Sequence, residues 1–239
     1  MVVHPRLHLV RWVSIHLASG AVVSGPFAGM RFHKRYLDLP KILGTYEIEL
    51  HEVFERLKGR RFTRVVDVGA AEGYYAVGVA LWNRDCSVVA YELNETYHES
   101  ISYLARINGV LPRIRIEGAC DQEALKSLAD DIKGTFLIMD VEGFEKELLD
   151  PRRTPQLLGA TISVEVHDCF VEGCTDAIIE RFERSHDISI YSSRGRRAEE
   201  YPLKSFISRL KLMHGAIAES ISDGRSAPNG WLLLQPKNS

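Results

Sequence analysis

The stretch Arg64–Glu92, RVVDVGAAEGYYAVGVALWNRDCSVVAYE, decides the fold of this 239-residue chain. Residues 65–68 form a short apolar run with one carboxylate inside it, and such runs beside glycine are typical of buried parallel strands. A glycine-bearing turn follows, and then a predicted helix over 74–82 and a second buried strand over 87–91. The stretch therefore predicts a strand–helix–strand unit with an acid, Glu92, at the tip of its second strand.

The first turn and the acid beyond it predict a site for a nucleoside-containing cofactor. Glycines let a ligand approach the backbone, and a carboxylate at the tip of the second strand accepts hydrogen bonds from a ribose. Glu92 lies 19 residues beyond Gly73, close to the roughly 20 expected of such an acid. An ordinary strand–turn–helix without a ligand is the alternative.

The charge of the turn favours a cationic cofactor. The turn has the pattern D-x-G-x-x-x-G (Asp67, Gly69, Gly73), and Asp67 and Glu72 bracket it. A pyrophosphate at this helix N-terminus would be repelled by roughly 1–4 kcal/mol per carboxylate. S-adenosylmethionine carries an ammonium and a sulfonium and has no phosphate, so it is the predicted cofactor. A nicotinamide dehydrogenase is the enzymatic alternative, disfavoured because the three-glycine turn G-x-G-x-x-G is absent.

Length and composition bound the class of protein. A chain of 239 residues that is 45% hydrophobic suits one α/β domain with an extension and a sizeable core. The formal net charge of −2 leads us to expect neither a nucleic-acid nor a membrane partner. Four scattered cysteines indicate a reducing, cytoplasmic setting rather than a disulfide scaffold. Charged and histidine residues interrupt the apolar stretch 7–23, so neither a signal peptide nor a membrane span is predicted.

Strands and helices alternate through the rest of the chain. Further strands are predicted over 114–116, 136–141, 161–167, 188–191 and 231–234. Further helices are predicted over 46–57, between Asn94 and Gly109, and over 143–149 and 175–183. The alternation predicts an α/β fold with an open, seven-stranded, mostly parallel sheet and helices on both faces. Ligands of such sheets bind beyond the carboxyl ends of the strands.

Carboxylates gather where the predicted strands end. The residues concerned are Asp67, Glu92, Asp121, Asp140 with Glu142, and Glu165 with His167 and Asp168. Because an uncompensated buried charge is costly, so many acids at buried strand ends indicate a cleft built for a cation or a metal.

The motifs at these strand ends resemble those of the FkbM-type methyltransferases, which are class I S-adenosylmethionine-dependent enzymes that usually methylate hydroxyls of small molecules or glycans. The resemblance rests on the first turn, on MDVEGFEKELLDP (Met139–Pro151) and on ISVEVHD (Ile162–Asp168), and it covers roughly Gly44–Pro236. It implies a Rossmann-like class I methyltransferase fold and O-methylation of a small-molecule or sugar hydroxyl. The pair Ala71-Glu72 departs from relatives, which often have a neutral pair there, so the cofactor contacts at this pair stay open.

The resemblance also implies which residues bind the cofactor. They are Asp67, Gly69, Ala70, Ala71, Gly73, Tyr74, Glu92, Leu93, Cys120, Asp121 and Asp140. Among them, Glu92 would hold the ribose hydroxyls and Asp121 would accept from the adenine amine. Asp140 would face the reactive end of the cofactor.

The predicted catalytic residues are His167, Asp140 and Glu165. His167 is the candidate base because the ordinary pKa of imidazole lies near neutrality, and Glu165 lies on the same strand face and could orient it. A structural histidine is the alternative. No metal ligand is assigned. A metal-dependent O-methyltransferase that uses Asp140, Glu142 and His167 is the less favoured alternative, as is a non-catalytic cofactor-binding or assembly protein.

The predicted methyltransferase domain spans residues 45–239. One further segment precedes this domain, and another is an insertion within it. Residues 1–44 are predicted to form a basic N-terminal extension that acts as a lid or dimerisation arm, so a homodimer is expected, and a solvated extension is the alternative. An insertion over 192–229 contains Arg194–Arg197, RGRR. This motif is either a contact for an anionic substrate or a solvated loop.

Overall fold

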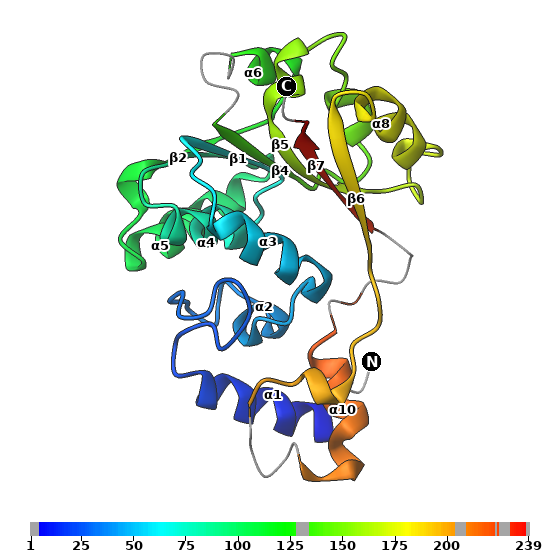
Figure 1. Cartoon of the computed structure of the whole chain (residues 1–239). Coiled ribbons are helices and arrows are strands. Elements are labelled where there is room, and N and C mark those ends of the chain that lie inside the picture. Colours follow the sequence, from blue (N-terminus) through cyan, green and yellow to red (C-terminus); the bar gives the residue numbers. More distant parts are fainter. Residues whose placement is uncertain (1–4, 128–133, 204–208, 223, 225–229, 238–239) are drawn as a thin grey trace. The chain divides into compact units, whose positions relative to one another are not determined.

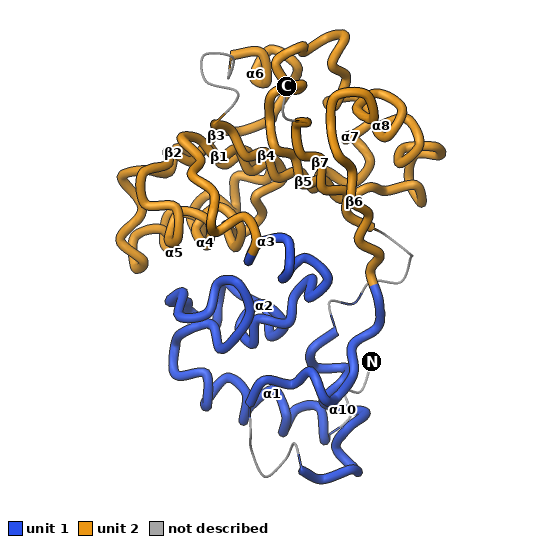
Figure 2. Tube along the Cα trace, viewed as in Figure 1, with its two compact units in different colours: residues 1–55, 194–226 blue, residues 56–193, 227–239 orange. Residues whose placement is uncertain are grey.

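The computed structural model describes residues 5–127, 134–203, 209–222, 224 and 230–237. The chain divides into two compact units (Figure 2). One unit comprises residues 1–55 and 194–226, and the other comprises residues 56–193 and 227–239. The second unit contains the stretch 64–92 and all the predicted strands.

The second unit is built on one seven-stranded sheet with the order β3-β2-β1-β4-β5-β7-β6 (Figure 1). Its strands are β1 (Arg64–Val68), β2 (Ser87–Tyr91), β3 (Ile114–Glu117), β4 (Thr135–Met139), β5 (Thr161–Val166), β6 (His186–Ser192) and β7 (Gly230–Pro236). The neighbours from β3 to β5 pair in parallel, whereas β7 runs antiparallel to both β5 and β6. The predicted α/β class and mostly parallel seven-stranded sheet are confirmed.

The strand predicted over 136–141 ends earlier, at Met139. A tight turn follows it, in which Glu142 and Gly143 have φ angles of 53° and 106°. A left-handed backbone cannot continue a strand ladder. Asp140 therefore lies just beyond the carboxyl end of β4.

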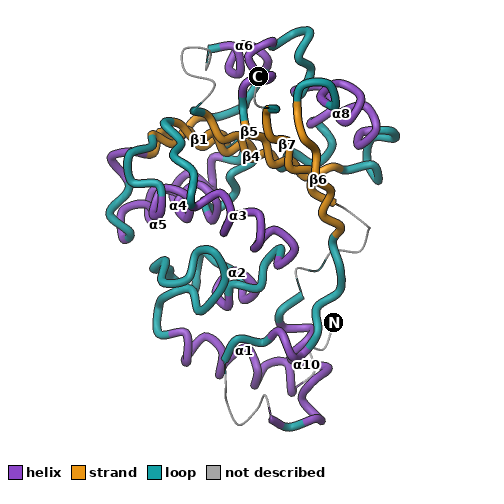
Figure 3. Tube along the Cα trace, in the orientation of Figure 1, coloured by secondary structure: helices purple, strands orange, loops and turns teal. Residues whose placement is uncertain are grey.

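Helices cover both faces of the sheet (Figures 1 and 3). One face carries α4 (Tyr74–Trp82) and α5 (His98–Ile107), and the other carries α6 (Gln122–Lys126), α7 (Glu145–Leu148) and α8 (Cys174–Phe182) (Figure 2). Short 3-10 helices lie between these elements at η2 (Glu95–Tyr97), η3 (Leu111–Arg113) and η5 (Pro155–Gly159). Both β4 and β5 are buried along their whole length. The sequence of β4 is accordingly a nearly continuous apolar run, whereas β5 alternates Thr161, Ser163 and Glu165 with apolar residues.

The first unit combines the N-terminal segment with part of the predicted insertion. Its helices are α1 (Pro5–Ala18), α2 (Leu39–Leu43), η1 (Ile48–Leu50), the start of α3 (His51–Lys58), η6 (Ala198–Glu200), η7 (Lys211–Met213) and α10 (His214–Ser220). The hydroxyls of Ser14 and Tyr201 lie 2.8 Å apart in a buried contact. Arg196 of the RGRR motif forms a buried ion pair with Glu49 at 2.9 Å. The two segments therefore share a core, and Arg196 contributes to it.

The predicted extension over 1–44 falls within this first unit, and its role as a lid or arm stays a prediction. Residues 204–208, 223 and 225–229 of the predicted insertion lie outside the described residues. Among the helices that the structure describes, none combines the length and the hydropathy that crossing a membrane requires.

Candidate active site

The first turn is held between the ends of β2 and β4. The N–H groups of Gly69 and Ala70 both donate to the Tyr91 carbonyl, at 2.9 and 3.0 Å. The N–H of Asp140 donates to the Val68 carbonyl at 2.9 Å. Gly69 has a φ of +84°, and a Cβ added there would lie 1.7 Å from the Asp140 carbonyl oxygen. The packing of the turn against the end of β4 therefore requires glycine at this position, whatever binds in front of it.

Glu92 is fixed beside this turn, where the sequence predicts the ribose acid. Its Oε2 accepts the N–H of Ala71 at 2.7 Å, and its Oε1 accepts the N–H of Asn94 at 2.8 Å. Each carboxylate oxygen has two lone pairs, so both oxygens keep capacity for ribose hydroxyls. Gly73 precedes α4, and a Cβ added there would lie 3.2 Å from Ile101 of α5. This glycine lets α5 pack closely against the turn.

Asp67 is buried at the end of β1 with one oxygen unsatisfied. Its side chain is 2% exposed, and its Oδ2 has no hydrogen-bond partner among the described residues. Burial raises the pKa of Asp67 to about 7, although the N–H of Ala76 in α4 opposes the shift. The negative charges of Asp140, Glu92 and Glu72 raise this pKa further. The site therefore has an excess of negative charge that a cationic ligand would offset.

Asp140 and Glu165 are neighbours at the carboxyl ends of β4 and β5. The register of these parallel strands pairs Met139 with Val164. The residues that follow this pair, Asp140 and Glu165, therefore lie beside each other. The register of β1 with β4 likewise places Gly69 beside Asp140. The structure thus brings the first turn and these two acids to one edge, as predicted for parallel strands.

His167 lies at the centre of a carboxylate cluster. The residue is 1% exposed, and its Nδ1 is hydrogen-bonded to Glu145 Oε1 at 2.7 Å. Its Nε2 lies 3.7 Å from Asp140 Oδ1, 3.6 Å from Glu142 Oε2 and 3.8 Å from Glu165 Oε1. Burial acts to lower the pKa of His167, but the Glu145 hydrogen bond and the nearby negative charges outweigh it and raise this pKa. The role of His167 as base stays a prediction.

Glu145 is a site residue to which the sequence interpretation assigns no role. It is fully buried, and the Oε1 that contacts His167 also accepts the N–H groups of Val141 and Gly143, each at 3.2 Å. Burial acts to raise the pKa of Glu145, but the hydrogen bonds from His167 and the backbone lower it below its usual range. Glu145 is therefore ionised and orients the imidazole. The motif MDVEGFE contains this residue, but no sequence pattern shows its contact with a histidine 22 residues away.

The cluster can hold a cation or accept a proton. Asp140, Glu165 and His167 offer ligand atoms that all lie within 4.8 Å of one another. Burial raises the pKa of Asp140 to about 6, against the opposing effect of His167. The Asp140 side chain is 28% exposed, so a substrate can reach a carboxylate that is more basic than an ordinary aspartate.

The other predicted cofactor residues have contacts of their own. Tyr74 is buried, and its ring centroid lies 5.5 Å from that of Tyr75. Asp121 caps α6 by accepting a backbone N–H of that helix at 2.8 Å. Leu93 is 78% exposed, and burial raises the pKa of Cys120 to about 12. Contacts of these residues with a cofactor stay predictions.

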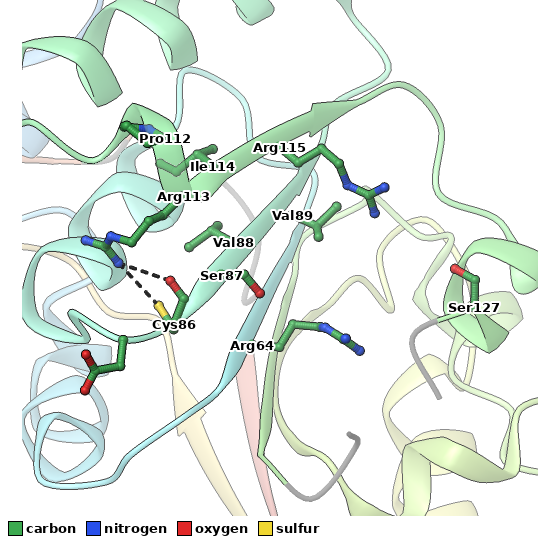
Figure 4. A pocket seen from close by; sticks show the side chains of 11 residues that line it. Arg64, Cys86, Ser87, Val88, Val89, Pro112, Arg113, Ile114, Arg115 and Ser127 are labelled. Atoms are coloured by element: carbon green, nitrogen blue, oxygen red, sulfur yellow. Dashed lines mark hydrogen bonds between the residues drawn. The ribbon is translucent and has the colours of Figure 1, made fainter. Parts of the chain in front are cut away.

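A pocket of about 550 Å³ lies at the opposite edge of the sheet (Figure 4). Its lining includes Arg64, Ser87 and Ile114, the first residues of β1, β2 and β3. Arg113 is held there by backbone carbonyls, among them that of Cys86 at 3.1 Å. Because ligands of open α/β sheets bind beyond the carboxyl ends of the strands, this pocket is not the candidate active site.

Comparisons with known proteins bear on the fold. No protein-family model matches the sequence, and no curated protein matches it. A structure from Klebsiella pneumoniae, provisionally assigned as an O-methyltransferase, matches with a TM-score of 0.51 and 13% identity, over 100% of this chain and 92% of that one. An rRNA methylase from Streptococcus thermophilus matches with a TM-score of 0.50 and 13% identity, over 80% and 97%. These likenesses show that the chain has a Rossmann-like methyltransferase fold.

Proposed function

We propose that this protein is an S-adenosylmethionine-dependent O-methyltransferase of the FkbM type that acts on a hydroxyl of a small molecule or sugar. The observation that carries the proposal is the unsatisfied, buried oxygen of Asp67, set among further acids at the carboxyl edge of a methyltransferase fold. The motifs around Asp140 and His167 support the finer assignment to the FkbM type, because they match that family in order.

The residues around the first turn fit this cofactor. Its ammonium and sulfonium offset the negative charges that raise the pKa of Asp67. Each carboxylate oxygen of Glu92 accepts one backbone N–H and can accept a further hydrogen bond from the ribose. When bound, the cofactor supplies an electrophilic methyl group. In this proposal Asp67, Glu92 and the turn 69–73 hold the cofactor.

The His167 cluster receives the acceptor hydroxyl. Glu145 fixes the imidazole through Nδ1, so Nε2 faces Asp140 and Glu165. Because these groups interact strongly, the cluster takes up the hydroxyl proton as a group rather than at one residue. Loss of that proton makes the acceptor oxygen a stronger nucleophile.

We expect S-adenosylmethionine to bind the full chain with an affinity that rises with pH below about 7. The rise should reach at most about tenfold per pH unit, because a bound cation favours the ionised form of Asp67, whose pKa is about 7. Above that pH this group contributes no further increase. Isothermal titration calorimetry between about pH 5.5 and 7.5 measures the affinity.

Two variants separate the site from general charge effects. Glu92→Gln should weaken binding by roughly 10- to 100-fold, the range expected for hydrogen bonds to a charged group. Glu123→Gln removes an exposed carboxylate that pairs with Lys126 on α6, and it should leave the affinity unchanged. The proposal fails if S-adenosylmethionine gives no heat of binding, and NADH binding in its place would favour the dehydrogenase alternative.

A further inference from the structure

We propose that Asp140, Glu165 and His167 bind one divalent cation of the Mn²⁺ class at the carboxyl ends of β4 and β5, with Glu142 at its open side. The ligand atoms of the first three residues lie within 4.8 Å of one another. Glu142 lies 3.6 Å from His167 Nε2, and its side chain is 73% exposed.

The donor atoms of the cluster are too far apart for direct hydrogen bonds and slightly farther apart than the ligands of one ion. Nε2 of His167 lies 3.6 to 3.8 Å from three carboxylate oxygens. Hydrogen bonds to such oxygens are about 2.7–3.2 Å long. Ligand atoms bonded to one ion at about 2.0–2.2 Å lie roughly 3.0–3.6 Å apart in tetrahedral or octahedral geometry. Small side-chain movements would therefore close the cluster around an ion.

A buried oxygen without a hydrogen bond and the second ring nitrogen of a buried histidine point into the cluster. The His167 side chain is 2% exposed, and the hydrogen bond of Nδ1 to Glu145 leaves Nε2 directed at the carboxylates. Oδ1 of Asp140 is buried and has no hydrogen-bond partner in the described part of the chain. Metal-bound histidines almost always donate their other ring N–H to a carboxylate, a carbonyl or a water. The Glu145–His167 pair has this arrangement.

The charges of the cluster also favour a cation. Four carboxylates surround a single imidazole: Asp140, Glu142, Glu145 and Glu165. The four carboxyl groups outnumber the one imidazole, so a protonated imidazole balances at most one of their charges. Uncompensated buried charge is costly, and a divalent ion in the centre would reduce it.

The ligand set indicates the class of ion, and the proposed function gives it a role. Carboxylates suit Mg²⁺, Ca²⁺ and Mn²⁺, and an imidazole shifts the preference toward first-row transition metals, so Mn²⁺ accepts the mixed set. The ion would lower the pKa of an acceptor hydroxyl bound to it. With the ion bound, Asp140, Glu165 and His167 would act as ligands and not as proton acceptors, so the exposed Glu142 would take the proton of that hydroxyl and release it to water. The oxygen forms a bond to the methyl carbon as the carbon–sulfur bond breaks, which leaves a methyl ether and a neutral thioether. This role rests on the proposed function, whereas binding of the ion does not.

Electron paramagnetic resonance of added Mn²⁺ tests the site in the EDTA-treated full chain, without S-adenosylmethionine. We expect one bound Mn²⁺ per chain. His167→Gln should weaken binding at least tenfold, and Glu145→Gln should weaken it about 10- to 100-fold. The matched control is His186→Gln, which alters another buried histidine. His186 lies in β6, and its ring is hydrogen-bonded to the Ala160 carbonyl. This control should bind Mn²⁺ as the unaltered protein does.

The unaltered protein provides a second test that needs no variant to fold. Electron spin-echo spectra of bound Mn²⁺ should show a ¹⁴N coupling from the imidazole nitrogen. Absence of stoichiometric binding at millimolar Mn²⁺, or binding without a nitrogen coupling, would overturn this inference. Failure of the proposed function is distinguishable, because it would show as Mn²⁺ binding without S-adenosylmethionine binding.

Discussion

Replacing Asp67 with asparagine should stabilise the ligand-free protein at neutral and alkaline pH, by on the order of 4 kcal/mol. Burial raises the pKa of Asp67 from 3.8 to about 7, so folding at neutral pH removes a carboxylate from water. The contribution of this group to stability is full below about pH 4 and is lost as the pH rises to about 7. Asparagine does not ionise, so the stability gap should widen by up to about 1.4 kcal/mol per pH unit within this window and stay constant above it.

Urea unfolding of both proteins at about pH 5, 6, 7 and 8 measures this gap in the free energy of unfolding. Asp187→Asn is the matched control, because Asp187 is an exposed aspartate in β6. Its effect should stay within about 0.5 kcal/mol at every pH. A gap for Asp67→Asn that does not change with pH would contradict the prediction.

The stabilised variant should bind S-adenosylmethionine at least tenfold more weakly, since it lacks the charge that the cation offsets. A variant that gains stability and loses affinity is the expected result when a fold keeps a destabilising buried carboxylate for binding. If Asp67→Asn raises stability and keeps full affinity, the buried carboxylate does not hold the cofactor.

The strands around the site could be predicted because their sequences carry a local signal. A strand buried on both faces, such as β1 or β4, is a nearly continuous apolar run, and glycines bound it. Parallel strands share one carboxyl edge, so the meeting of Asp140 with Glu165 could also be predicted. The order of the seven strands and the reversed direction of β7 could not, because pairing depends on contacts between segments that are distant in sequence.

The features that could not be predicted depend on contacts between residues far apart in the sequence. The hydrogen bond of Glu145 to His167 depends on the turn after β4, where Glu142 takes a left-handed conformation. The buried ion pair of Glu49 with Arg196 likewise joins two segments that are far apart in the sequence. The sequence shows that these residues are charged, but it does not show that they contact each other. Basic composition predicts an interaction with anions, but it does not show whether the partner lies in the same chain.

Gly69→Ala should destabilise the fold by several kcal/mol, whereas Gly109→Ala should cost only about 1–2 kcal/mol. Both glycines have a left-handed backbone, with φ angles of +84° and +72°, so both substitutions carry the same kind of backbone strain. The two positions differ in the room available for a Cβ atom. A Cβ at Gly69 would lie 1.7 Å from the Asp140 carbonyl oxygen, and one at Gly109 would meet nothing within 4 Å. Losses above about 4 kcal/mol for a single substitution are exceptional and mark a clash of this kind.

Denaturant unfolding of the two variants side by side measures the difference, and the unaltered protein gives the reference. Relief of the clash at Gly69 requires the first turn to move away from β4, which would also displace Asp140 and open the His167 cluster. Gly69→Ala should therefore lose Mn²⁺ binding and S-adenosylmethionine binding together, even where enough folded protein remains to assay. Gly109→Ala should keep both, because Gly109 follows the C-cap of α5 and a Cβ there would meet nothing within 4 Å. Equal destabilisation of the two variants would show that the turn is not clamped against β4, and the placement of Asp140 beside the cofactor turn would then be wrong.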